Sequence, residues 1–173
     1  APMHVDVTGR PWPVRAYYRL WSRTDYAQRH HVGGVFAFSE VGRARFDAFP
    51  EVVNDDLFVR SCFRATEVAT VATQPFTVQA PRTLRGLVRR RVRVEIGNLQ
   101  QRGGTAAAVE SASVTPVLPD YAPWWHAVRS DPRLLPSAGP YLVVHGIAKV
   151  VARWRARRGA AVTWARDDSR RPG

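Results

Sequence analysis

Hydrophobic and polar positions follow two different periods along this chain, which predicts a mixed fold. Apolar residues recur at helical i, i+3, i+4 spacing in three stretches: 15–26, 83–94 and 141–158. Shorter apolar or alternating runs occupy 31–38, 68–71 and 76–78, and such runs are typical of strands. We therefore expect an α/β fold, with a few-stranded sheet, flanking helices and an amphipathic helix near the C-terminus.

The arginine-rich helix at 83–94 carries two distinct faces in this pattern. Four apolar residues are expected to point inward: Leu84, Leu87, Val88 and Val92. Arg85, Arg89 and Arg93 are spaced four apart and share another face. Gly97, with Gly103 and Gly104, is expected to end the helix, because glycine is the least favourable helix-interior residue after proline.

The helix at 141–158 is also two-sided. A basic stripe consists of His145, Lys149, Arg153 and Arg157. The expected opposite face is apolar and consists of Leu142, Val143, Val144, Ile147, Val150, Val151 and Trp154. Two interpretations stay open: the apolar face packs on the rest of the protein, or it lies on an anionic membrane surface.

Turn and capping residues suggest how the other segments are organised. The proline-containing residues 1–14 are expected to be irregular, Ser39 to cap a short helix from Glu40 to Phe46, and Asp56 to Phe63 to be helical. Prolines and the aromatic residues Tyr121, Trp124 and Trp125 predict a mostly irregular arm at 112–140. This change of character divides the chain into 1–111 and 112–173.

Composition narrows the class of protein. The chain has 173 residues and a formal net charge of +12, but Lys149 is its only lysine. Such a skew indicates coding bias toward arginine, so the charge is discounted as a sign of specific nucleic-acid binding. The single cysteine, Cys62, excludes an internal disulfide and is expected to be a buried thiol on a helix. With no signal peptide and no run of about 18–20 apolar residues, we expect a cytoplasmic protein.

Two short segments carry candidate chemistry. Asp55 and Asp56 stand where a helix is expected to begin, and a carboxylate kept ionised there can accept a proton from a hydroxyl group. The alternative is simple N-capping. The arginine cluster at 85–93 can bind phosphate through guanidinium forks, or it can be a solvated helix face.

The order of these motifs resembles a known family. Gly33-Gly34-Val35-Phe36-Ala37, Arg43-x-Arg45-Phe46 and Asn54-Asp55-Asp56 precede Pro81-Arg82-Thr83-Leu84 and Arg90-x-x-Arg93-Val94. This series resembles the second half of family 2 glycosyltransferases, which have the GT-A (Rossmann-like) fold. The resemblance covers residues 15–100 well and the remainder loosely.

The resemblance implies a role for each matched residue. Asp56 would be the general base of an inverting sugar transfer, and Asp55 its acidic neighbour. Arg90 and Arg93 would steady the departing diphosphate, and Gly33 and Gly34 would border the acceptor pocket. The donor would be a nucleotide-sugar, and the acceptor an unknown glycan or lipid-linked hydroxyl. A lipid-linked acceptor would favour contact of 141–158 with the inner face of the plasma membrane.

Several residues depart from the family pattern, and these departures limit the activity and the metal binding that we expect of this chain. Arg90 and Val94 replace the Gln and Trp of the Gln-x-x-Arg-Trp motif, which favours a non-processive enzyme. No histidine stands near Gln79, where many relatives have a metal ligand. The nucleotide-binding half and its Asp-x-Asp motif are not in the sequence. The whole enzyme is expected to need Mg²⁺ or Mn²⁺, held mostly outside this chain, and no metal site is assigned here.

Two other functional classes remain. The chain can be a non-catalytic basic module that binds nucleic acid or anionic membrane, or a gene fragment without function. The first predicts binding that falls steeply with salt and does not need the carboxylates.

Overall fold

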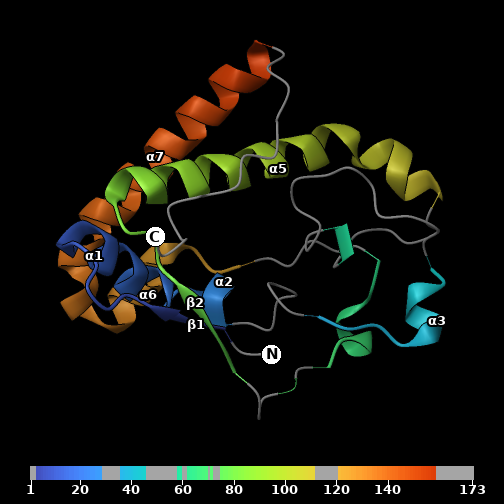
Figure 1. The fold of residues 1–173 in the computed structure, drawn as a ribbon, viewed down its shortest axis with the longest axis horizontal. Helices are drawn as coiled ribbons and strands as arrows, with labels where there is room; N and C mark the ends of the chain where they lie inside the picture. The colour runs from blue at the N-terminus through green and yellow to red at the C-terminus, as the bar shows by residue number, and fades with distance from the viewer. Residues whose placement is uncertain are drawn as a thin grey trace, which may run out of the picture.

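The described part of the computed structural model comprises residues 3–28, 36–45, 58–59, 62–69, 71, 75–111 and 121–158, without the side chains of 65 and 100–111. Figure 1 shows the arrangement of its elements. In chain order these are β1 (Met3–Asp6), α1 (Trp12–Trp21), α2 (Asp25–Gln28), α3 (Glu40–Arg43), η1 (Ala65–Glu67), β2 (Phe76–Gln79), α5 (Leu84–Ser111), α6 (Trp124–Ser130), η2 (Pro132–Leu134) and α7 (Leu135–Arg157).

A small parallel sheet combines with these helices, so the expected α/β character is confirmed at this coarse level. Strands β1 and β2 pair in register from Met3 opposite Phe76 to Asp6 opposite Gln79. The expectation of an irregular lead-in at 1–14 was wrong, because β1 and the start of α1 lie there. Pro11 occupies the N-cap position of α1 and Pro13 its first turn, where a missing N–H costs nothing.

The predicted helix at 15–26 is largely confirmed. It is divided into α1 and α2, and Tyr17 and Leu20 face the core as expected, while Trp21 is half-buried. The core cluster around Tyr17 joins α1 to β2, α5 and α7 through buried residues of each: Val14, Tyr17, Tyr18, Ala80, Leu87 and Val144.

Helix α5 is much longer than expected. Thr83 caps it, since its hydroxyl oxygen accepts the Gly86 N–H at 3.1 Å. The helix then continues through Gly97, Gly103 and Gly104 to Ser111, so the expectation that these glycines end it was wrong. A helix-interior glycine costs only about 1 kcal/mol, and strong helix formers surround these three. Leu87 and Val92 face inward as predicted, whereas Leu84 in the first turn is exposed.

The described part of the arm expected at 112–140 is mostly helical, so the expectation of a mostly irregular arm was wrong there. Residues 121–140 contain α6, η2 and the first turn of α7. Among the described prolines of this arm, Pro140 lies inside α7, but the others stand at helix starts: Pro123 is the N-cap of α6, Pro132 begins η2, and Pro136 lies in the first turn of α7. Proline is compatible with these positions because first-turn N–H groups lack intrahelical partners.

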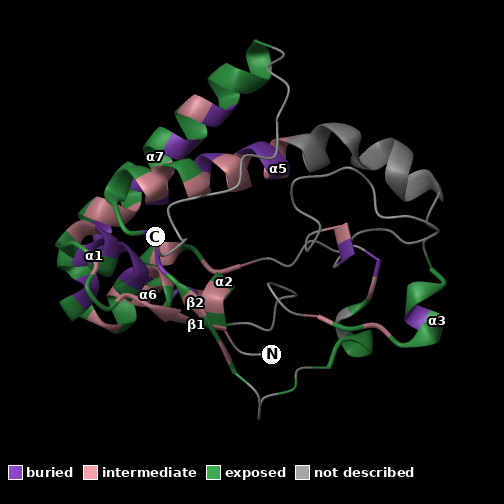
Figure 2. Ribbon diagram, in the orientation of Figure 1, coloured by how far each residue is buried: buried purple, intermediate pink, exposed green. Residues whose placement is uncertain are grey.

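Helix α7 packs against α5 and α1 with a face that only partly matches the expected one: Val144 is buried and Val151 half-buried as predicted, but the other five residues of the expected face are exposed. Ala148 and Ala152 are fully buried against Val92 and Ile96 of α5. The large apolar residues of α7 are mostly exposed, as the green patches along it show in Figure 2. The small alanines allow the two helices to pack closely, and most of the larger apolar residues of α7 are left on its outer side.

Other local predictions had mixed outcomes. Ser39 caps α3 as expected, but this helix ends at Arg43. Residues 36–38, 68, 69 and 71 are not strands, while the strand at 76–78 is confirmed as β2. Only Phe58 and Val59 are helical in the described part of 56–63, and Cys62 lies in a turn rather than on a helix, although it is buried as expected.

We predict that Leu87→Ala lowers the free energy of unfolding by about 2–5 kcal/mol, because it removes a fully buried side chain and leaves a cavity. Leu84→Ala is the matched control. It makes the same chemical change on the same helix at a site that is 39% exposed, and we expect less than about 1 kcal/mol. Equal losses in urea denaturation would contradict the observed orientation of α5.

Candidate functional site

The described residues include only part of the predicted site. Asp55, Asp56, Gly33 and Gly34 lie outside them. Arg90 and Arg93 lie on α5, three residues apart and both half-buried. Arg85 and Arg89 of the same cluster are exposed, as the alternative of a solvated helix face predicts, whereas Arg90 and Arg93 are partly withdrawn from water.

A tyrosine of α1 orients Arg90. The Arg90 guanidinium donates from Nη1 to the Tyr18 hydroxyl oxygen at 3.4 Å. This contact ties the guanidinium to the buried face of α1. Because an arginine side chain is long and flexible, holding it in one orientation lowers the entropy lost when it binds a phosphate group.

The neighbouring Arg91 has a structural role that sequence reasoning missed. It pairs with Glu95 at 3.1 Å and approaches Nδ1 of His145 at 3.5 Å. Nε2 of the same ring lies 3.2 Å from the Tyr17 hydroxyl oxygen. These side chains form a polar network between α1, α5 and α7.

The electrostatics of this network keep His145 neutral. Burial, followed by repulsion from Arg91 and Lys149, lowers the pKa of His145 from 6.5 to about 3. Burial also raises the pKa of the Tyr17 hydroxyl. Neither group titrates near neutral pH. The network is therefore a helix-packing contact, and the basic stripe predicted on α7 loses its first member to the protein interior.

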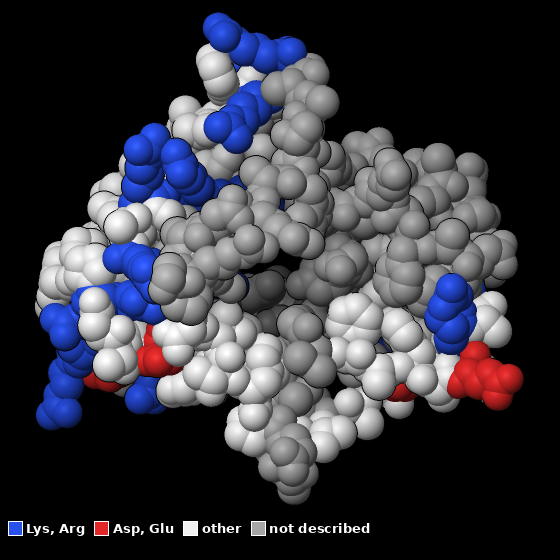
Figure 3. All heavy atoms as spheres, in the orientation of Figure 1, with Lys and Arg blue, Asp and Glu red and all other residues white. Residues whose placement is uncertain are grey.

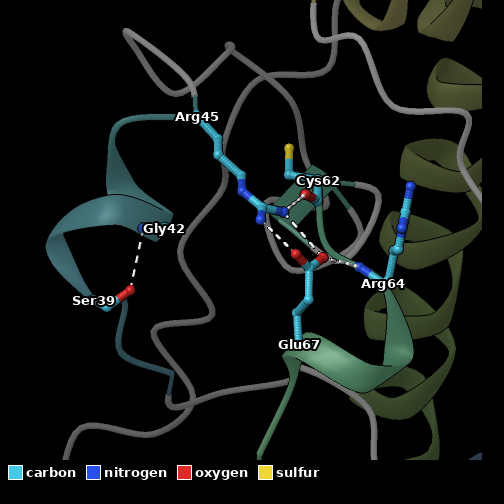
Figure 4. Close-up of polar contacts among 6 residues, drawn as sticks. All are labelled: Ser39, Gly42, Arg45, Cys62, Arg64 and Glu67. Atoms are coloured by element: carbon cyan, nitrogen blue, oxygen red, sulfur yellow. Dashed lines mark hydrogen bonds and ion pairs between the residues drawn. The ribbon is translucent and has the colours of Figure 1, made fainter.

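A second polar cluster lies far along the chain from the first and is centred on Arg45 (Figure 4). Arg45 forms a two-pronged ion pair with Glu67, with Nη1 3.0 Å from Oε2. The same Nη1 donates to the Cys62 carbonyl oxygen at 3.1 Å. Glu67 Oε2 also accepts the backbone N–H of Arg64 at 2.8 Å.

Aromatic packing supports this cluster. The Arg45 guanidinium lies 5.0 Å from the centre of the Phe63 ring, within the range of a cation–π interaction. Phe63 stacks on Phe38 at 5.7 Å. Phe63 also packs against α3, where a Cβ at Gly42 would lie 3.3 Å from its ring. Glycine at this position permits the close approach.

The Arg45 cluster holds together the two ends of the segment that carries the acidic motif. Arg45 immediately precedes residues 46–61, and Cys62 and Glu67 follow them. Asp55 and Asp56 belong to this segment. The resemblance included Arg45 but gave it no role. Its pairing with a carboxylate 22 residues later could not be recognised from local spacing.

A shallow pocket of about 410 Å³ lies at the carboxyl end of β2 and is lined by Arg10, Thr77, Val78, Gln79, Ala80 and Arg82. Arg10 donates to the Gln79 side-chain oxygen at 3.0 Å, and the Gln79 amide donates to Asp6 at 2.7 Å. Hydrogen bonds from Thr8, and then from Gln79, lower the pKa of Asp6 to about 2. The pocket is therefore lined by two arginines and a pre-oriented amide.

The described residues do not fit a divalent cation. No group of three or more His, Cys, Asp or Glu residues lies close enough there to hold a metal ion. Gln79, near the position of the family's metal ligand, instead bonds to Arg10 and Asp6.

No family model, curated protein or solved structure matches this chain. The functional assignment therefore depends on its residues and their geometry.

The pairing of Arg45 with Glu67 predicts an unusual carboxyl titration. Hydrogen bonds from Arg45, and then from the Arg64 backbone, lower the pKa of Glu67 from 4.5 to about 2. The stabilisation from this pair is complete above pH 4.5 and is lost as pH falls toward 2. In Arg45→Ala, NMR titration is expected to show the Glu67 pKa returning most of the way to 4.5.

The control for this experiment is Arg64→Ala, which keeps the backbone N–H that bonds to Glu67. It removes only the long-range charge of the Arg64 side chain, which is the smallest contribution to the shift. A wild-type Glu67 midpoint near 4.5, or equal effects of the two variants, would contradict the observed pairing.

Proposed function

We propose that this chain is the acceptor-side half of an inverting, non-processive glycosyltransferase of the GT-A type. Its reaction would move a sugar from a nucleotide-sugar to a hydroxyl of a glycan or lipid-linked acceptor. The observation that carries the proposal is the Arg45 cluster, which joins the two ends of the segment with Asp55 and Asp56. Joining these two ends supports the proposal, because it limits how far from the cluster the acidic motif between them can lie.

The arginines of α5 give the proposal its second component. They follow the acidic segment in the same order as in the family that the sequence resembles. Arg90 is oriented by Tyr18, and both Arg90 and Arg93 are half-buried. Fixed cations in a partly desolvated setting stabilise developing negative charge more than mobile, solvated ones do.

In the proposed reaction, Asp56 accepts the proton of the acceptor hydroxyl as its oxygen attacks the anomeric carbon. The bond between that carbon and the nucleoside diphosphate breaks, and the configuration of the sugar inverts. The diphosphate leaves with the bonding electron pair, and Arg90 and Arg93 stabilise its increasing charge. Asp55 orients Asp56 or contacts the acceptor, and Gly33 and Gly34 border the acceptor pocket.

In a protein that joins this chain to a nucleotide-binding half, we predict that Asp56→Asn lowers kcat about 10²–10⁴-fold, as expected for loss of a general base. Donor affinity should change little, because the base contacts the acceptor side. The measurements are steady-state transfer kinetics and calorimetric binding of the nucleotide-sugar.

Asp131→Asn is the matched control for Asp56→Asn. Asp131 makes a capping contact with the Arg133 backbone at η2, so the same chemical change should leave kcat within about twofold of the wild type. Near wild-type kcat in Asp56→Asn would show that Asp56 is not the base.

We also predict that the 173-residue chain alone transfers no measurable sugar. Its sequence offers an acceptor-side base but no nucleotide-binding unit to present a donor. The assay is incubation with a panel of nucleotide-sugars and hydroxyl acceptors, followed by mass spectrometry. Transfer above the no-protein background would contradict the division of the site between this chain and a donor half.

A further inference from the structure

The outer side of α7 presents a continuous apolar stripe, which we define as Val143, Ile147, Val150 and Trp154. Their spacing of four, three and four residues puts them in one line along the helix. Each is between 43% and 69% exposed. Leu142, beside the stripe, is 46% exposed. Contiguous exposed apolar surface of this kind indicates an interaction site.

The stripe cannot turn inward without disrupting the fold. The opposite side of α7 is fully buried at Val144, Ala148 and Ala152, which pack against α1 and α5. The stripe is therefore a surface feature of the packed protein.

Cations border the stripe. Exposed Arg153 and Arg157, three residues after Val150 and Trp154, adjoin it on one side, and Arg155 and Arg158 also stand at the end of the helix. The Arg158 guanidinium lies 4.1 Å from the centre of the Trp154 ring. Figure 3 shows Lys and Arg gathered around this protruding end of α7. The described residues of the helix from 135 onward include no acidic side chain.

We propose that α7 docks on the surface of an anionic lipid bilayer, with the stripe in the headgroup and upper acyl region. Apolar residues on one face with flanking lysine and arginine are the requirements of an interfacial helix. Trp154 fits this location, because tryptophan is enriched at the level of the lipid headgroups. Arg153 and Arg157 would reach lipid phosphates while their stems stay in the apolar layer.

The same features disfavour other occupants. Nucleic-acid phosphates would pair with the cations but gain nothing from Val143, Ile147 and Val150. A second copy of the chain would bring two strongly cationic helix ends together. The docking does not depend on sugar transfer, so it is independent of the function proposed above.

A helix lying on the membrane also fits better than one crossing it. By length and composition, Pro132–Arg157 is apolar enough to span a bilayer, contrary to the expectation that no segment approaches this requirement. A spanning helix would have to leave α1 and α5 and expose His145 to lipid. Lying in the interface keeps those contacts.

The test is flotation of the full chain with vesicles of phosphatidylcholine alone and with 30% phosphatidylserine. We expect binding to the anionic vesicles, and about tenfold weaker partitioning for Ile147→Asp, which places a charge in the stripe. Val41→Asp is the matched control, because Val41 is 77% exposed on α3, far from α7 (Figure 1). It should bind like the wild type.

A second pair of variants tests the charge requirement independently of the stripe. Arg153→Glu and Arg43→Glu change the net charge equally, but only Arg153 borders the stripe. We expect Arg153→Glu alone to weaken binding to anionic vesicles several-fold. Circular dichroism checks that each variant keeps its helix content.

Several outcomes would overturn the proposal. These are failure of the wild type to float with anionic vesicles, or equal effects of Ile147→Asp and Val41→Asp. Concentration-dependent dimers that Ile147→Asp abolishes, in a chain that does not bind vesicles, would assign the stripe to a second copy. Tighter binding to a DNA duplex than to vesicles, unaffected by Ile147→Asp, would assign the cations to nucleic acid.

Discussion

The burial of Tyr17 beneath α7 is the constraint on which the arrangement of the helices depends. This side chain is only 1% exposed, so its hydroxyl needs a partner inside the protein, and His145 provides it. Tyr141 stacks on the Tyr17 ring at 5.4 Å. A buried hydroxyl without a partner would cost about 1–3 kcal/mol. The contact therefore fixes the rotation of α7 about its own axis.

That rotation has consequences on both sides of α7. With Tyr141 and His145 inward, Ala148 and Ala152, one and two helical turns after His145, meet α5. The larger apolar side chains are then directed outward. On α5, Arg91 joins the network through His145 and Glu95, while Arg90 contacts Tyr18. Arg91 thus takes part in helix packing, and the neighbouring Arg90 lies beside α1.

The sequence predicted what depends on local periodicity. The helices around Tyr17, Leu87 and Val151 all exist, because amphipathic spacing is a local property. Strand β1 was missed since its partner residues lie 73 positions away, as Asp6 and Gln79 show. The extent of α5 was missed because a glycine penalty is small compared with the packing of a long helix.

The inward face of α7 was predicted correctly only at Val144 and Val151, for a different reason. Apolar residues occur on two sides of this helix, and a hydrophobicity argument favours the side with the larger ones. Close packing on α5 instead selects alanine. Within the candidate site, Arg90 could be singled out from its motif, but its partner Tyr18 could not. The Arg45–Glu67 ion pair could not be predicted either, because its two residues are 22 positions apart. The roles of Asp55 and Asp56 remain predictions.

The proposed membrane docking and the proposed sugar transfer both involve helices α5 and α7. α5 packs along α7, so a membrane that holds α7 also fixes the position of α5 relative to the lipid. Arg90 and Arg93 would then lie at a defined distance from the bilayer. An enzyme acting on a lipid-linked hydroxyl gains from this arrangement, because a substrate confined to the membrane reaches a site held beside it without a three-dimensional search. The face of α7 that the core leaves exposed is therefore where such an acceptor would approach.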